Sequence, residues 1–243
     1  MTYLELLYEL APVKKREELR ARLNVLKEIV DWIDVPDSPM GSTSQFSPLV
    51  SCLVKSVEEV RVIAHIRTID LSRVALTSAT KSLELCGVER VVYVRGDVVQ
   101  NSSVVRDLEP ENAVSLVKQL SLNISPGLTI SLRKDLTEIL KRMGSSADFY
   151  LILNLSEKTF EKLERVSRVA RSANVKIYPY LIVATENSYG ALANLLGRER
   201  VLLAEKALEV ALNNSHLVDG FLVSSPLDFR GGVNFLNSLR RTA

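Results

Sequence analysis

The chain alternates short apolar runs with longer stretches in which apolar residues recur at helical spacing. The short runs predict eight strands, and most of the longer stretches predict amphipathic helices. The predicted strands cover residues 6–10, 32–35, 59–67, 90–97, 128–132, 148–155, 175–184 and 219–227. The predicted helices cover residues 16–30, 49–55, 71–87, 111–122, 135–143, 156–174, 186–196, 199–213 and 233–240.

The regular alternation predicts an α/β fold, a (β/α)8 TIM barrel. Mostly apolar strands indicate a parallel sheet covered on both faces, and eight strands are the number that closes such a barrel. The rival is an open doubly wound sheet, which would usually carry a glycine-rich first turn, and residues 9–13 have none. We find no internal repeat and no long linker, so residues 1–243 are expected to form one domain.

Composition narrows the classes of partner. The net charge is +2, from 31 basic and 29 acidic residues, so no overall field favours nucleic acid or a membrane surface. No apolar run is long enough to span a membrane and the N-terminus shows no signal peptide, so we expect a cytoplasmic protein. Cys52 and Cys86 are then expected to be reduced, small core residues rather than a disulfide, and their spacing predicts no metal site.

Polar side chains collect where the predicted strands end. Barrel enzymes carry their working residues at the carboxyl ends of the strands and in the loops that follow. In chain order these positions hold Glu9, Asp34, Asp37, His65, Arg67, Arg95, Asp97, Arg133, Asn154, Tyr180, Thr185, Ser224 and Ser225. The sequence therefore predicts a site at this end of the barrel.

Three of these residues have a chemical and a structural interpretation. Glu9 lies in an apolar run, where desolvation would raise its pKa and suit a proton donor, or it pairs with a basic neighbour. His65 is a functional imidazole or a hydrogen-bonded core residue. Asp97 follows Gly96, which would let a ligand approach the backbone, or it caps its own turn. The glycine pair at 231–232 is likewise open to two interpretations, an anion-binding nest and an ordinary loop.

The order of these motifs resembles the methylenetetrahydrofolate reductase family, whose members are flavin-containing barrels. The best segments are YELAP at 8–12, DWIDVPDSP at 31–39 and the stretch from AHIR to RGD at 64–97. The strand order continues more loosely afterwards. VKIYPYLIVATENS at 175–188 resembles the family's seventh strand, and LVDGFLVSSP at 217–226 resembles its eighth.

The resemblance implies a flavin-dependent oxidoreductase of one-carbon metabolism and methionine biosynthesis. Reduced FAD would pass a hydride to a methylene-pterin or methylene-folate and give a methyl group. Glu9 would be the general acid, and Asp97 would stabilise the cationic intermediate and help tune the flavin. The residues implied to contact the flavin are His65, Val94, Arg95, Gly96 and Asp97. Those implied to contact the pterin are Glu9, Asp97, Tyr150 and Asn154.

Several positions depart from the family pattern. Pro36 stands where the family has threonine, Arg67 replaces a second threonine, and TISLRKD at 129–135 lacks the tyrosine and histidine that help hold FAD. FMN or no flavin is therefore an alternative to FAD. A second hypothesis is a flavin-free pterin-binding homologue, acting as a subunit or methyl-transfer partner, and a homo-oligomer is also possible. A third is a barrel that acts on another substrate.

Overall fold

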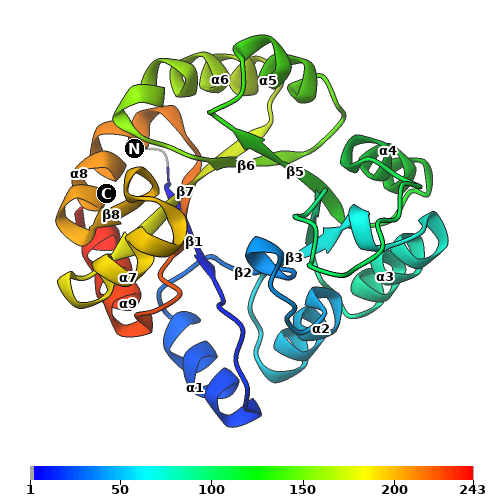
Figure 1. Cartoon of the computed structure of the whole chain (residues 1–243), viewed down its shortest axis with the longest axis horizontal. Helices are drawn as coiled ribbons and strands as arrows, with labels where there is room; N and C mark the ends of the chain where they lie inside the picture. The colour runs from blue at the N-terminus through cyan, green and yellow to red at the C-terminus, as the bar shows by residue number, and fades with distance from the viewer. Residues whose placement is uncertain (1–2, 243) are drawn as a thin grey trace.

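A computed structural model describes residues 3–242 and shows a closed parallel barrel surrounded by helices (Figure 1). Eight strands close the barrel because β1 pairs with β9, β9 with β7, and β7 with β6. These strands are β1 (Glu5–Glu9), β2 (Trp32–Val35), β3 (Val62–Arg67), β4 (Arg90–Val94), β5 (Ser125–Ser131), β6 (Phe149–Leu153), β7 (Lys176–Ala184) and β9 (Gly220–Ser224). The predicted TIM barrel is confirmed.

The helices form a ring outside the strands, and each covers part of the barrel wall (Figure 1). They are α1 (Arg16–Leu26), α2 (Ser47–Val57), α3 (Arg73–Leu85), α4 (Pro110–Gln119), α5 (Leu136–Met143), α6 (Phe160–Ser172), α7 (Glu186–Leu196), α8 (Ala204–Asn214) and α9 (Phe229–Thr242). Short 3₁₀ turns occur at Pro39–Gly41, Thr68–Asp70, Glu157–Thr159, Arg198–Arg200 and Ser215–Leu217. No helix within residues 3–242 combines the length and hydropathy needed to cross a membrane.

One additional strand, β8 (Val201–Leu203), lies outside the closed barrel. It pairs with residues 182–184 of β7, at the carboxyl end of that long strand. The prediction of a continuous helix over 199–213 was therefore wrong at its start. Helical spacing is a local signal, whereas the pairing of residues 201–203 with β7 is a contact between separate segments that such spacing does not report.

The N-terminal end of the barrel is filled by paired charges and aromatic rings. The Arg90 guanidinium lies 3.8 Å from the centre of the Trp32 ring and donates a hydrogen bond of 3.0 Å to the Tyr178 hydroxyl. Tyr178 in turn donates to the Glu5 carboxylate, which also pairs with Lys176 at 3.3 Å. These interactions close this end, so the polar side chains available for chemistry lie at the opposite end.

The middle of the barrel is an apolar layer. Alternate residues of each strand point inward, and the buried inner side chains are Leu7, Trp32, Ile63, Val92, Phe149, Leu151, Tyr178 and Leu222. At Gly127 the Phe149 ring takes the space of a side chain, since a Cβ there would lie 2.4 Å from it. This layer separates the charged N-terminal end from the C-terminal end.

Cys52 of α2 and Cys86 at the end of α3 form a disulfide, with Cα atoms 5.3 Å apart. The prediction of two reduced core cysteines was wrong. The pairing depends on α2 and α3 lying side by side on the barrel, and two cysteines that are 34 positions apart carry no local signal of that contact.

We predict that reducing the disulfide lowers the free energy of unfolding by about 2–4 kcal/mol, because the bond closes a long loop in the unfolded chain. Urea unfolding with and without reductant would measure the difference. The double variant Cys52→Ala/Cys86→Ala is the control, since reductant should leave its unfolding unchanged. Finding two free thiols in the unreduced, unfolded protein would contradict the bond.

Candidate functional site

Glu9 ends β1 at the C-terminal end of the barrel. Its half-buried side chain accepts a hydrogen bond of 2.6 Å at Oε1 from the Ser224 hydroxyl of β9. Burial raises the pKa of Glu9, and the negative charge of Asp34 raises it further. Hydrogen bonds from Ser224 and Tyr180 and the charge of His65 oppose this rise without cancelling it. The carboxyl is thus held toward its protonated form, which is the form that a general acid needs.

Asp34 and His65 form a buried pair on neighbouring strands. Asp34 of β2 is fully buried and His65 of β3 is 7% exposed, with 2.8 Å between Oδ1 and Nε2. Burial alone would lower the pKa of His65. The charges of Asp34, Glu9 and Asp37 and the hydrogen bond to Asp34 outweigh that effect, so the pKa is raised. The pair therefore favours an imidazolium beside a carboxylate.

Tyr180 links the two carboxyl groups. It lies on β7 and donates a hydrogen bond of 3.4 Å to Oδ2 of Asp34. Burial and the charges of Asp34 and Glu9 raise the pKa of Tyr180 well above its ordinary value, so the phenol stays neutral. We call Glu9, Asp34, His65, Tyr180 and Ser224 the mouth cluster.

The strand register explains why the cluster forms. Glu9 and Asp34 are direct partners in the pairing of β1 with β2, so their side chains project to the same face. Sequence reasoning placed Asp34, Tyr180 and Ser224 at strand ends and assigned them no role. The signal that could have found Asp34 and Ser224 is their position at the end of an apolar strand, whereas Tyr180 lies in the middle of β7.

Arg67 anchors two loops above β3. Arg67 is 1% exposed, and its side chain donates to Asp70 at 2.5 Å, to the Ser38 carbonyl at 3.1 Å and to the Asp97 carbonyl at 2.6 Å. Gly96 has a positive φ of 84°, and a Cβ there would lie 2.9 Å from the guanidinium carbon. Gly96 was expected to let a ligand approach, whereas here its close neighbour is the Arg67 side chain.

The other residues predicted to contact the flavin lie at the end of β4 and in the loop after it, and they differ in exposure. Asp97 is exposed, and within residues 3–242 its carboxylate makes no hydrogen bond or ion pair. Arg95 is also exposed and pairs with Glu109 at 2.6 Å. Val94 is half-buried and packs against the inner apolar layer. These residues follow β4 at the same end of the barrel as the mouth cluster, but no contact joins Asp97 to Glu9 among the described residues.

The two residues in or next to β6 that were predicted to contact the pterin have different surroundings. Tyr150 is fully buried on the outer face of β6, and its hydroxyl donates to the Met143 carbonyl of α5 at 3.1 Å. This position argues against the predicted substrate contact of Tyr150. Asn154 follows β6 at the C-terminal end, half-buried, and its amide donates to the Ser131 hydroxyl at 2.9 Å. Asn154 therefore remains a candidate.

The glycine pair at 231–232 lies within α9 rather than in a loop. The Gly231 N–H donates at 2.9 Å to the carboxylate of Asp228, which also accepts from the Thr185 hydroxyl at 2.7 Å. These two bonds lower the pKa of Asp228 and keep it ionised. A carboxylate of the chain itself thus takes the place where a barrel of this kind often binds phosphate.

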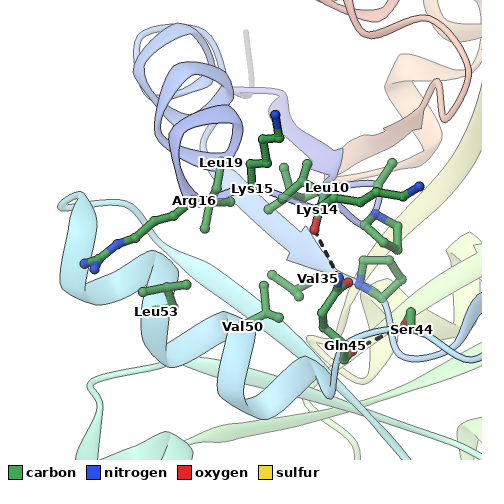
Figure 2. A pocket seen from close by; sticks show the side chains of 14 residues that line it. Leu10, Lys14, Lys15, Arg16, Leu19, Val35, Ser44, Gln45, Val50 and Leu53 are labelled. Atoms are coloured by element: carbon green, nitrogen blue, oxygen red, sulfur yellow. Dashed lines mark hydrogen bonds between the residues drawn. The ribbon is translucent and has the colours of Figure 1, made fainter.

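A cavity of about 200 Å³ lies outside the barrel wall, next to α1 and α2 (Figure 2). Leu10 and Val35 line it, and each directly follows a residue of the mouth cluster on its strand. Because successive strand residues face opposite sides, this cavity is separate from the mouth cluster. Gln45, labelled in Figure 2, donates a hydrogen bond of 3.1 Å to the Val13 carbonyl.

A family model described as methylenetetrahydrofolate reductase matches residues 8–134, just over half of the chain. The match extends past residue 97, where the clearest resemblance in the sequence ended. It contains Glu9, Asp34, His65 and Asp97 and excludes Tyr180. Comparison with curated proteins finds no match. Among the described residues, no group of acidic, cysteine and histidine side chains could hold a metal ion.

The two acids of β1 should affect stability with opposite dependence on pH. The raised pKa of Glu9 gives stability that is present below its unfolded pKa and lost as pH rises through its folded pKa. Burial alone would raise the pKa of Glu5, but the Tyr178 hydrogen bond and the charges of Lys176 and Arg90 lower it overall. The stability that Glu5 contributes is therefore present above its unfolded pKa and lost as pH falls through its folded pKa.

We predict that the stability difference between wild type and Glu9→Gln decreases as pH rises, while that between wild type and Glu5→Gln increases. Urea unfolding over a pH series would measure both differences. Each variant serves as the control for the other because both acids lie on one strand. Slopes of the same sign would contradict the two environments described above.

Proposed function

Because the chain belongs to the methylenetetrahydrofolate reductase family, we propose that it reduces a methylene-pterin to a methyl-pterin with a flavin. Membership itself supports an oxidoreductase that acts on a small folate- or pterin-type molecule. The observation that carries the specific reaction is Glu9, a carboxyl with a raised pKa at the C-terminal end of a family barrel.

Glu9 is the general acid in this proposal. Ser224 donates to Oε1, and in this proposal Oε2 carries the proton. Transfer of that proton to the bridging nitrogen of the substrate opens the methylene ring to an iminium cation. Desolvation raises the pKa of Glu9 and so favours the protonated carboxyl, the form in which it can donate a proton.

The cation requires negative charge that is already in place. Asp97 supplies it in this proposal, because its exposed carboxylate is free of hydrogen bonds and ion pairs within residues 3–242. Asp34 is less suited because its two oxygens are bound by His65 and Tyr180. Asn154, at the end of β6, is the proposed amide contact for the pterin.

In this proposal the ring system of the flavin would bind at the C-terminal end of the barrel. Among residues 3–242, Nδ1 of His65 makes no hydrogen bond and is free for an acceptor atom of the ring, and Val94 offers an apolar contact. The Arg95–Asp97 segment would contact the flavin from the loop after β4. A bound reduced flavin would supply the hydride. The phosphates fit less well at the end of β9, because Asp228 already binds the N–H of Gly231.

This last observation favours a second candidate function. A homologue without flavin would bind a reduced pterin and act as a subunit or a methyl-transfer partner of another protein. The carboxylate of Asp228 at the usual phosphate position and the departures in the fifth strand support it. A homo-oligomer and a cytoplasmic location remain predictions.

We predict that Glu9→Gln lowers kcat for methylene-pterin reduction by about 10²-fold or more, because the proton donor is lost. Stopped-flow or steady-state assays with methylenetetrahydrofolate and reduced flavin would measure the change. Glu5→Gln is the matched control, since Glu5 lies on the same strand at the filled end of the barrel. Equal activity of Glu9→Gln and wild type would eliminate Glu9 as the acid.

We also predict that the purified protein binds FAD or FMN, visible as a flavin absorption spectrum that survives gel filtration. A protein that stays colourless with both flavins, yet binds tetrahydrofolate in a calorimetric titration, would favour the flavin-free function. Failure to bind either class of ligand would refute both proposals.

A further inference from the structure

The two ring nitrogens of His65 have different surroundings. Nε2 lies 2.8 Å from the Asp34 carboxylate, whereas Nδ1 makes no hydrogen bond within residues 3–242. The backbone of His65 is also fixed, because its N–H donates to the Ser47 hydroxyl at 3.0 Å. Ser47 in turn donates to the Val35 carbonyl at 2.7 Å. The ring thus has one nitrogen held by the protein and one left for a ligand.

Asp34 is held as firmly as the ring it binds. Its side chain is fully buried, and its second oxygen accepts from Tyr180 at 3.4 Å. Its own carbonyl accepts from the Leu10 N–H at 2.8 Å. A carboxylate with both oxygens bound and no access to water has a fixed orientation, and it fixes the plane of the imidazole bound to it.

We propose that Asp34 is a positioning residue of the proposed flavin site. Its carboxylate holds His65 as an imidazolium whose Nδ1–H donates to a carbonyl oxygen or ionised ring nitrogen of the bound heteroaromatic ring. The inference rests on the proposed function for the identity of the ligand. The coupling of Asp34 to His65 is independent of it.

The charges around His65 favour this state. Asp34 of β2, 2.8 Å from Nε2, is the strongest of the charges that favour the protonated ring, ahead of Glu9 from β1 and Asp37 from the loop after β2. Burial raises the pKa of Glu9 and Asp37 and so reduces the negative charge that these two acids carry. Arg67 is the neighbouring cation on β3, and Asp70 and two backbone carbonyls engage its guanidinium. Without the Asp34 carboxylate, burial of the ring would favour the neutral imidazole, in which Nδ1 need not carry a proton.

The test is an NMR titration of the imidazole signals. The chain has two histidines, so His216→Gln identifies the His65 signal without further assignment. We expect the pKa of His65 in wild type to lie above about 6.5, the value of an unperturbed histidine. Asp34→Asn should lower it, and Asp37→Asn, which removes a more distant charge, should lower it less. A His65 pKa below 6.5 in wild type, or one unchanged by Asp34→Asn, would overturn the proposal.

A second measurement tests the ligand. Using FAD as the probe, we expect the Kd at neutral pH to rise about tenfold in Asp34→Asn, because a charged donor is lost, and to change little in Asp37→Asn. A Kd unchanged by Asp34→Asn would overturn the positioning role. If wild type binds no flavin, the proposed function and the donor role toward flavin fail together, and the titration still decides whether Asp34 controls His65.

Should Asp34→Asn fail to fold, a wild-type His65 pKa below about 6.5 would still overturn the proposal. Asp34→Glu is a further test, because it keeps the negative charge but moves the carboxylate away from the backbone by one methylene group. It should retain a raised pKa at His65 and lose part of the flavin affinity, a combination that a purely structural role of Asp34 would not produce.

Discussion

The junction between β1 and β9 closes the barrel, and the contacts of Ser224 with Glu9 and of Tyr180 with Asp34 depend on it. Residues 5–8 pair in parallel with residues 220–223, so the first and last strands become neighbours. Gly220 makes the approach possible, because a Cβ there would lie 2.0 Å from the Glu5 carbonyl oxygen. The same junction carries Ser224 to Glu9, a contact between residues 215 positions apart.

Closure also gives the two ends of one strand opposite electrostatic environments. At the N-terminal end, cations and a phenol surround Glu5 and keep it ionised. At the C-terminal end, burial and a second carboxylate hold Glu9 toward its protonated form. The apolar layer between them separates the two environments. A barrel can therefore place a structural acid and a candidate catalytic acid four residues apart.

The mouth of this barrel combines family features with departures from them. Glu9, at the end of β1, and His65, in the C-terminal half of β3, lie within the segment that the family model matches. Arg67 instead uses its whole guanidinium to join the loops after β2 and β4, and Gly96 leaves room for it. Asp228 similarly fills an anion position with a side chain of the protein. Both changes replace space for a ligand by internal contacts, so the ring-binding part of the proposed site has stronger support than its phosphate-binding part.

The sequence by itself determined the barrel and the candidate acid. Apolar alternation located all eight strands of the barrel, and the position of Glu9 at the end of an apolar run indicated a raised pKa. These signals are local. Strand and helix periodicity, and desolvation by neighbouring apolar residues, each depend on residues that lie within a few positions along the sequence.

Only the tertiary structure decided which side chains meet. In the folded chain His65 binds Asp34, and Tyr150 points outward to α5. Cys52 is bonded to Cys86, and β8 pairs with the edge of β7. Each outcome depends on register or helix packing between segments far apart in the chain. A one-residue change of register would turn every side chain of a strand to the other face, so such contacts cannot be deduced from periodicity.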